Sequence, residues 1–298
     1  MQEVEIMSFS IVTDSPANLP LDEICRRGIL VIPLSYYLNG TESICHAPEG
    51  CDLPGYFQAL KQKGEVKTSM IPPQRFVEYW EPLLQAGQDV LFISISSGIS
   101  SSYAAACIAA EQLLESYPDR SIRVLDSLCS SLGEGLLVLR AFAFRSQGMG
   151  LNETVQALES LRFRMCHVFT VDDLMFLKRG GRLSGAAAVL GTVLQIKPLL
   201  KGNEEGHIVL SGKARGRSQS IKALAQRYED LVAYPGDQTV CIAHGNCPED
   251  AQTLARLIRQ NKPPKEILIS CFDPINGAHA GPGALALFFE GEEGCRTR

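Results

Sequence analysis

The stretch at residues 91–103, LFISISSGISSSY, constrains the fold of this chain more than any other. An apolar, β-prone run passes directly into six serines and one glycine, and the alanine-rich run Ala104–Ala110 follows. This order predicts a strand end, a tight turn and a helix N-terminus in immediate succession. A helix N-terminus carries unsatisfied N–H groups and a partial positive charge, so it can hold an anion. We therefore expect the serine turn (residues 94–102) to lie at an anion-binding site, where its serines cap the helix or contact the ligand.

The first half of the chain alternates short β-prone runs with helical segments. A strand is also expected to end at Thr68 and Ser69, because the pair Pro72-Pro73 stops a strand and starts a helix. Such alternation indicates a parallel sheet covered by helices, whose ligands bind at the carboxyl ends of the strands. We predict an α/β domain with a parallel sheet over residues 8–163. Its apolar strands are expected at Phe9–Thr13, Ile29–Leu34, Val90–Ile95 and Ile122–Leu125.

The second half has longer β-runs and hairpin-like turns. A small-residue helix is expected over Ser184–Leu194, and Lys213–Arg217 is expected to open another helix. Gly281-Pro282-Gly283, beside His279, is predicted to be a rigid loop ahead of the last apolar strand, with His279 held in the same constrained loop. These features favour an α+β domain with a mixed sheet over residues 164–290. The tail, residues 291–298, is expected to be disordered.

Net charge and hydropathy indicate which partners and which cellular location to expect. The 298 residues carry 28 Lys and Arg against 33 Asp and Glu, a net charge of −5, so nucleic acid is not an expected partner. The N-terminal stretch MQEVEIMSFS has no basic region and no apolar core of a signal peptide. No apolar run approaches the roughly 20 residues that span a bilayer. We expect a cytoplasmic protein without a transmembrane segment.

The cysteines and the short catalytic motifs argue against a metal centre and against catalysis. Ten cysteines are scattered without a C-x-x-C pair, which favours free thiols in a chain without a signal peptide. Cys45, His46 and Cys51 could be three zinc ligands, but no second cluster completes a site, so no metal is predicted. No G-x-S-x-G elbow or Walker loop occurs, and Asp14 with Ser15 is interpreted as a cap. We expect a ligand-binding protein without a cofactor rather than an enzyme.

Seven short motifs occur in order between residues 9 and 289. They are Thr13-Asp14-Ser15, Lys67-Thr68-Ser69, Ser96–Ser100, Leu177–Arg182, Ile196-Lys197-Pro198, Lys213–Gly216 and Gly277–Gly283. Each motif alone is weak evidence for a family, whereas the complete set in this order is strong evidence. Together they resemble the DegV family of bacterial fatty-acid-binding proteins, which includes the carriers that serve fatty acid kinase.

The resemblance implies a two-domain protein that holds one long-chain fatty acid between its domains. The family's head-group threonine and serine fall on Thr68 and Ser100, and the histidine of its G-x-H-x-G-P-G motif falls on His279, near the carboxylate. The arginine of the G-G-R turn falls on Arg182, and that of the R-G pair falls on Arg215. In kinase-linked members a separate ATP-using kinase converts the bound acid to an acyl phosphate. Arg215 is our candidate for contacting that kinase or the phosphate.

One position departs from the family's usual pattern. The family reads L-S-G-T where residues 99–102 read I-S-S-S, so Ser101 places a Cβ where backbone can approach the ligand. The predicted ligand-binding residues are Thr68, Ser69, Ser100, Ser101, Arg182 and His279.

A fatty acid makes two demands on its site. Burial of each methylene of the acyl chain stabilises the complex by about 0.8 kcal/mol, so we expect an apolar tunnel. The small residues of the expected helix Ser184–Leu194 suit a slim tunnel. The carboxylate must instead be paired. We expect it to be held by the hydroxyls of Thr68 and Ser100, the amides of the serine turn, and His279.

Two other functions stay open at this point. Ser100 and His279 could act as nucleophile and base of a small-molecule hydrolase or phosphotransferase, which requires hydrogen-bond contact between them and an orienting acid. The site could also bind another anionic metabolite, which predicts a polar cavity without a tunnel. Local roles are open as well, because Ser100 can serve as an N-cap and Thr68 as part of a turn.

Overall fold

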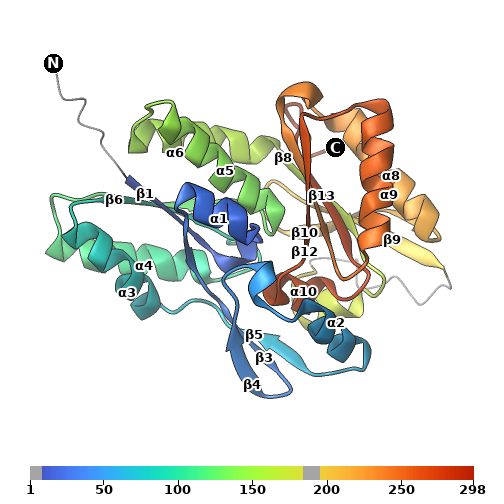
Figure 1. Ribbon diagram of the computed structural model, residues 1–298, viewed down its shortest axis with the longest axis horizontal. Helices are drawn as coiled ribbons and strands as arrows, with labels where there is room; N and C mark the ends of the chain where they lie inside the picture. The colour runs from blue at the N-terminus through green and yellow to red at the C-terminus, as the bar shows by residue number, and fades with distance from the viewer. Residues whose placement is uncertain (1–8, 184–194) are drawn as a thin grey trace.

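The computed structural model describes residues 9–183 and 195–298. Its elements form layers, with two large sheets on either side of a central helix layer and a further helix layer on each outer side (Figure 1). A third, smaller sheet lies at one end of the molecule, beside α2 (Leu53–Lys61) and α10 (Pro274–Ala280). The predicted helix Ser184–Leu194 lies outside the described residues.

The first large sheet is parallel throughout, in the order β2-β1-β6-β7. Apolar runs form these strands because helices cover both faces of the sheet. Val12 and Phe92, opposite each other in β1 and β6, are completely buried. The predicted parallel α/β arrangement of the N-terminal half is confirmed. The strands are β1 (Phe9–Asp14), β2 (Leu30–Ile32), β6 (Asp89–Ser94) and β7 (Ile122–Asp126).

The helices of this half lie on both faces of the parallel sheet. The outer face packs against α3 and α4, whose apolar stripes include Trp80 and Ala106. Small alanine side chains let α4 approach the sheet closely. The helices are α1 (Leu21–Arg27), α3 (Pro73–Gln85), α4 (Ser102–Ser116), α5 (Leu132–Ser146) and α6 (Leu151–Leu161).

The smaller sheet is antiparallel, in the order β4-β3-β5. Asn39 and Gly40 connect β3 (Ser35–Leu38) to β4 (Thr41–Ile44) with φ values of 52° and 84°, as a two-residue hairpin turn requires. The strand ahead of the prolines, β5 (Val66–Thr68), pairs with β3 in this sheet and not with the parallel sheet.

The second large sheet is mixed, in the order β10-β9-β8-β13-β11-β12. Only β11 and β12 are parallel neighbours among its described strands. Helices α8 (Arg217–Leu231) and α9 (Pro248–Asn261) cover its outer face. The predicted mixed sheet is confirmed. Its strands are β8 (Met165–Thr170), β9 (Ile196–Gly202), β10 (Ile208–Arg215), β11 (Thr239–His244), β12 (Glu266–Cys271) and β13 (Leu285–Glu290).

Two local predictions for this half are wrong. Lys213–Arg217 does not open a helix, because Lys213 to Arg215 continue β10 and α8 begins at Arg217. His279 belongs to α10, which extends to Ala280, rather than to the loop at Gly281-Pro282-Gly283 that follows it. Glycines at 277 and 281 disguised this short helix, whose N-cap Asp273 accepts from two backbone amides.

The helix α5 joins the two halves because it lies between the large sheets. A Cβ at Gly133 would lie 2.9 Å from Phe288 Cδ1 in β13, and a Cβ at Gly135 would lie 2.7 Å from the Ala17 carbonyl oxygen. Glycine is therefore required for α5 to contact both sides so closely. One hydrophobic cluster runs from β1 through α5 to β13 and so includes residues of both halves. The predicted domain boundary between residues 163 and 164 therefore stays a proposal.

The prediction of a disordered tail is wrong. Cys295 and Arg296 are each 2 % exposed. The Arg296 guanidinium donates to the carbonyl oxygens of Leu128 and Asn203, which anchors the C-terminal segment between the loop before α5 and the turn after β9.

The free-thiol prediction is wrong for one pair of cysteines, because Cys45 and Cys51 form a disulfide. The remaining eight cysteines are free. Over the described ranges, no group of three His, Cys, Asp or Glu side chains is placed to hold a metal ion.

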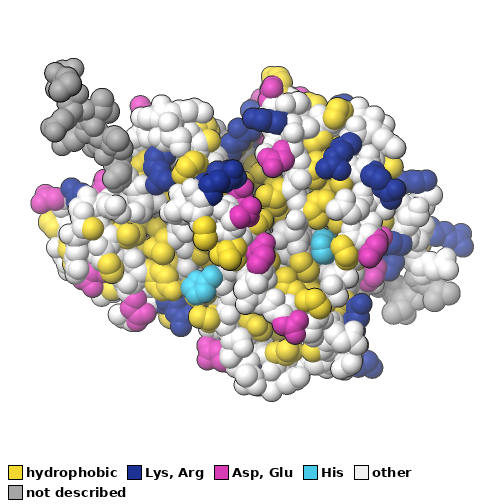
Figure 2. Space-filling model, viewed as in Figure 1, with side chains coloured by type: hydrophobic (Ala, Val, Ile, Leu, Met, Phe, Trp, Pro, Cys, Tyr) yellow, Lys and Arg dark blue, Asp and Glu magenta, His cyan; other side chains and the backbone are white. Residues whose placement is uncertain are grey.

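The surface and the helices carry two further observations. On the face in Figure 2, Lys and Arg side chains are interspersed with Asp and Glu over both halves of the molecule. Among residues 9–183 and 195–298, no helix combines the length and the hydropathy needed to cross a membrane.

Candidate functional site

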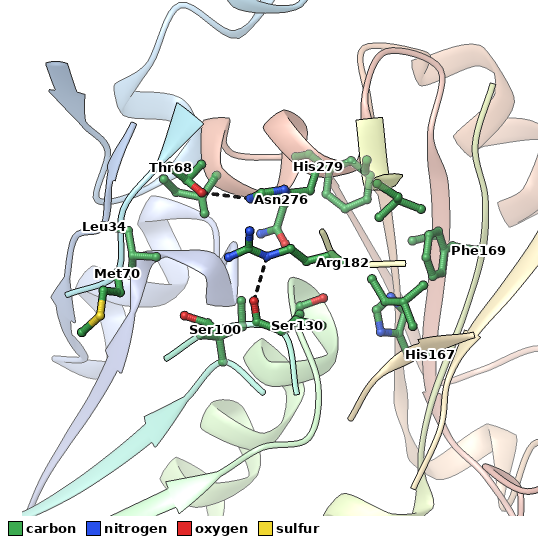
Figure 3. A pocket seen from close by; sticks show the side chains of 18 of the residues that line it. Leu34, Thr68, Met70, Ser100, Ser130, His167, Phe169, Arg182, Asn276 and His279 are labelled. Carbon is green, nitrogen blue, oxygen red and sulfur yellow. Dashed lines mark hydrogen bonds between the residues drawn. The ribbon is translucent and has the colours of Figure 1, made fainter. Parts of the chain in front are cut away.

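A cavity of about 280 Å³, the inner cavity, lies between the ends of the parallel sheet, α10 and the mixed sheet (Figure 3). It has a polar part at the serine turn, β5 and α10, and an apolar part toward β8 and β13. Its apolar lining is Leu34, Met70, Ile95, Ile99, Phe169, Leu177, Ile208, Phe272, Ile275, Ala280 and Ala286. Six of the seven residues predicted from the sequence also line it: Thr68, Ser69, Ser100, Ser101, Arg182 and His279.

Thr68 and His279 meet on the cavity wall, although they are far apart in the sequence. Thr68 Oγ1 lies 2.9 Å from His279 Nε2, within hydrogen-bond distance. Thr68 ends β5, opposite Tyr36 of β3, and His279 lies in the last turn of α10. The packing of α10 against the small sheet therefore creates the pair.

The environment of His279 keeps its ring neutral. Burial, followed by the nearby positive charge of Arg182, lowers the pKa of His279 to about 4. Its Nδ1 atom is buried without a hydrogen-bond partner in the described part of the chain. A Cβ at Gly180 would lie 2.2 Å from that atom, so the glycine makes room for the ring.

Arg182 lies between the Thr68–His279 pair and Ser100 in the view of Figure 3. Its Nε atom donates to the Ile99 carbonyl at 2.9 Å, and its Nη1 atom donates to the Gly180 carbonyl. Burial lowers the pKa of Arg182, but a guanidinium stays protonated in proteins. No carboxylate of the described residues pairs with it, so the cavity contains a half-buried cation without a counter-charge.

The serine turn lies beside Arg182, but the protein itself already uses most of its amides. The Ile95 amide donates to Asp14 Oδ2 at 3.0 Å, and the Ser97 amide donates to Asp126 Oδ1 at 3.1 Å. The amides of Ser96, Gly98, Ile99, Ser100 and Ser102 have acceptors within the protein as well. The turn is therefore not the open row of amides that we expected, and only Ser101 has an N–H without an acceptor among the described residues.

The side chains of this turn have local partners. Ser100 Oγ donates to Ser102 Oγ at 3.0 Å and accepts from the Ser102 amide at 3.2 Å, so it bonds at the start of α4 while facing the cavity. Ser101 is the formal N-cap residue but makes no side-chain capping bond, and its hydroxyl contacts Met70 Sδ at 3.3 Å. Ser69 donates its amide to the Ser35 carbonyl.

Arg215 does not join this cluster. It ends β10 opposite Ile196, is exposed, and does not line the inner cavity.

A second hollow of about 460 Å³, the outer pocket, shares one wall with the inner cavity. The shared residues are Thr68, Arg182 and His279. Lys63, Lys67, Arg179 and Glu65 line its outer part. The polar end of the inner cavity thus shares these three residues with a depression lined by Lys63, Arg179 and the ion pair of Lys67 with Glu65.

Several residues at or beside the site were not assigned to it from the sequence. Asp14 is completely buried, and it holds the serine turn at Ile95 instead of capping the segment that follows it. Burial raises the pKa of Asp14 to about 7 and raises that of the neighbouring Glu134 well above its usual value. The sequence signal that could have identified this pair is a Glu within the largely apolar helix α5. Ser130 and His167, which also line the cavity, gave none.

The geometry does not match the serine hydrolase alternative. His279 pairs with Thr68, Ser100 pairs with Ser102, and no acid orients His279 Nδ1 among the described residues. A nucleophile, a base and an orienting acid are therefore not assembled.

Comparison with known proteins identifies the family. A family model described as an uncharacterised protein of the DegV family matches residues 8–292. A DegV domain-containing protein of Clostridium perfringens is 39% identical over 284 residues, covering 95% of this chain and 98% of that protein.

Two solved structures share the fold. One, on fatty acid binding of a DegV family protein from Thermus thermophilus, has a TM-score of 0.86 and 29% identity, covering 95% of this chain and 99% of that one. The other, DegV from Bacillus subtilis, described as a fatty acid binding protein, has a TM-score of 0.82 and 28% identity, covering 96% and 100%. The chain belongs to the DegV family.

Proposed function

We propose that this chain binds one long-chain fatty acid in the inner cavity, between its N-terminal and C-terminal halves. The observation that carries the proposal is the half-buried Arg182 guanidinium, which lacks a carboxylate partner in the described part of the chain and lies beside a large apolar wall. A ligand with one acidic group and a long apolar chain matches both properties. The fatty acid binding described for the two relatives supports the same ligand class.

The proton on the His279 ring decides how Thr68 can act. With that proton on Nε2, the ring donates to Thr68 Oγ1, and the Thr68 hydroxyl remains free to donate to a ligand. We assign this tautomer because it leaves an acceptor, rather than an N–H, without a partner at the buried Nδ1. His279 then acts on the carboxylate through Thr68.

The carboxylate accepts from Thr68 and Arg182 in this proposal. A charge-assisted hydrogen bond from a guanidinium is stronger than a neutral one, so Arg182 provides the larger share of head-group binding. Ser100 and the free Ser101 amide complete the site on the side of the serine turn, and Ser69 borders it. A Cβ at position 101 is compatible with this arrangement because the side chain turns to Met70.

The acyl chain extends along the apolar wall toward β8 and β13. Phe169, Leu177 and Ala286 lie on this wall. Each buried methylene contributes about 0.8 kcal/mol before the cost of ordering the chain. The cavity volume of about 280 Å³ is close to the lower end of small-molecule sites, which start at roughly 300 Å³, so we propose a slim tunnel.

We further propose that the protein presents the bound acid to a separate ATP-dependent fatty acid kinase, which forms the acyl phosphate, while this chain does no chemistry and needs no cofactor. The outer pocket supports this step, because it reaches Thr68, Arg182 and His279 from the other side and is lined by Lys63 and Arg179. A phosphate formed on the carboxylate would meet positive charge there. Arg215, exposed on β10, is proposed to contact the partner.

Denaturing mass spectrometry of ligand extracted from the purified protein tests the proposal. We expect a stoichiometric long-chain fatty acid, and a kinase with ATP should convert it to an acyl phosphate. A purely polar extract would favour the anionic-metabolite alternative and overturn fatty acid binding. An empty protein that hydrolyses an ester would overturn it in favour of the hydrolase.

A further inference from the structure

Two further polar side chains line the inner cavity and have no role in the proposed carboxylate site. His167 belongs to β8, Ser130 precedes α5, and both line the inner cavity. In Figure 3, His167 lies on the opposite side of the cavity from Thr68, with Arg182 between them. An acyl chain whose carboxylate is bound at Thr68 and Arg182 would pass beside His167 and Ser130 on its way along the cavity.

Aromatic neighbours hold His167 in place, but the protein does not use its ring nitrogens. The residue is 8 % exposed, stacks on Phe169 with ring centroids 5.1 Å apart, and has its centroid 4.6 Å from that of Phe288. Among residues 9–183 and 195–298, neither ring nitrogen has a hydrogen-bond partner. The stacking therefore fixes the ring and leaves its polar atoms to the contents of the cavity.

Ser130 is presented by a loop with an uncommon backbone. Leu128 and Ser131, on either side of it, have φ values of 54° and 52°, which non-glycine residues rarely adopt. Ser130 itself is 7 % exposed, and its hydroxyl has no partner in the described part of the chain. Arg296 donates to the Leu128 carbonyl, so the C-terminal segment holds this loop at the cavity.

Arg296 also influences the chemistry of His167. Burial, followed by the charge of Arg296, lowers the pKa of His167 to about 3, so the ring is neutral at physiological pH. The Arg296 guanidinium donates to the carbonyl oxygens of Leu128, Arg162 and Asn203, and it does not line the cavity. This part of the cavity thus offers two neutral hydrogen-bonding groups rather than a cation for a second carboxylate.

We propose that the preferred ligand is a long-chain fatty acid with a hydroxyl group on its acyl chain, which hydrogen-bonds to His167 and Ser130; this rests on the fatty acid function proposed above. A plain hydrocarbon chain would displace water from both side chains and leave them unpaired, which is unfavourable for buried polar groups. A hydroxyl has both a donor and acceptor lone pairs, so its chemistry suits either partner, the neutral imidazole of His167 or the hydroxyl of Ser130. Thr68 and Arg182 select for the carboxylate, and His167 with Ser130 select for the substituted chain.

Competition binding of octadecanoic acid against hydroxyoctadecanoic acids that differ in the position of the hydroxyl tests this selectivity. The best hydroxy acid should bind the wild type about tenfold more tightly than octadecanoic acid, as expected for one satisfied buried hydrogen bond. In the double variant His167→Phe/Ser130→Ala, which keeps an aromatic ring in the stack and removes both polar groups, the ratio of the two affinities should fall to about one. His167→Gln and Ser130→Ala should each retain part of it, and thermal denaturation checks that each variant folds.

The possible outcomes separate this inference from the fatty acid function. Equal affinity of octadecanoic acid and every hydroxy isomer would overturn the inference and leave fatty acid binding intact. Tighter binding of an α,ω-dicarboxylic acid than of any hydroxy acid would overturn it in favour of a second anion site. A failure of all these acids to bind would overturn the fatty acid function itself.

Discussion

The serine turn and the wall formed by Arg182 and His279 face the same cavity, but they differ in how much of their hydrogen-bonding capacity the protein already uses. Asp14 and Asp126 accept from amides of the turn, and the hydroxyls of Ser94, Ser96, Ser100 and Ser102 bond to one another or to backbone groups. On the wall, Arg182 has no carboxylate partner and His279 Nδ1 has no partner at all among the described residues. The number of polar residues in a segment therefore does not measure its capacity to bind a ligand.

The sheet explains why the turn is already satisfied. Neighbouring strands of a parallel sheet end at the same edge, so β1 and β7 deliver Asp14 and Asp126 beside the turn that follows β6. These carboxylates occupy the amides that would otherwise attract an external anion. Arg182 follows α7 (Met175–Arg179) and His279 lies in α10, both far along the chain, and no carboxylate of the described residues pairs with Arg182.

The largest expected effect is that of Arg182→Ala, which tests whether the wall dominates head-group binding. Removing a partly buried charged donor costs about 1.5–3 kcal/mol, so we expect fatty acid affinity to fall by roughly hundredfold. Arg215→Ala is the matched control, because it removes an arginine outside the cavity. Isothermal titration with both variants checks this, and equal losses would contradict the comparison.

The second-largest effect is expected for the hydroxyl of Thr68, which pairs with His279 on the wall, compared with that of Ser100 in the serine turn. Thr68→Ala should lower fatty acid affinity by about tenfold, because the freed His279 Nε2 also loses its partner. Ser100→Ala should cost about threefold or less, because that hydroxyl already bonds to Ser102. If the order of the two losses were reversed, the serine turn would be the principal carboxylate site. The double variant Thr68→Ala/Ser100→Ala should lose more affinity than either single variant but less than Arg182→Ala, and full retention would refute both assignments.

The smallest effect concerns the carboxyl group that holds the turn. Burial raises the pKa of Asp14 from 3.8 to about 7. Between about pH 4 and 7 the folded state keeps a proton that the unfolded chain has released, so this group makes the protein less stable as the pH rises. The variant Asp14→Asn keeps an acceptor for the Ile95 amide but does not titrate. Its free energy of unfolding should therefore fall less steeply with rising pH than that of the wild type, by at most about 1.4 kcal/mol per pH unit. Urea denaturation across this range measures both slopes, and a steeper decline in the variant would contradict the assignment.

Sequence reasoning was most successful where local pattern and tertiary structure agree. The apolar runs at 9–13 and 90–95 became buried parallel strands because helices cover both faces. It failed where tertiary contacts override local composition. Gly277 made α10 look like a loop, yet a Cβ there would lie 2.9 Å from the Phe57 ring, so that glycine serves close packing of a helix. The polar C-terminal tail looked disordered because no local pattern indicates that Arg296 donates to three backbone carbonyls far away in the sequence.

The sequence by itself determined the parallel and mixed sheets, the order of the family motifs and six of the residues that gather at the inner cavity, since these follow from hydrophobic periodicity and from short motifs. Only the tertiary structure decided which of those residues are available to a ligand. The distribution of hydrogen bonds depends on partners that are far apart in the chain, such as Thr68 with His279 and Asp14 with Ile95. An unpaired group such as Arg182 can be recognised only after every neighbour that could pair with it has been placed.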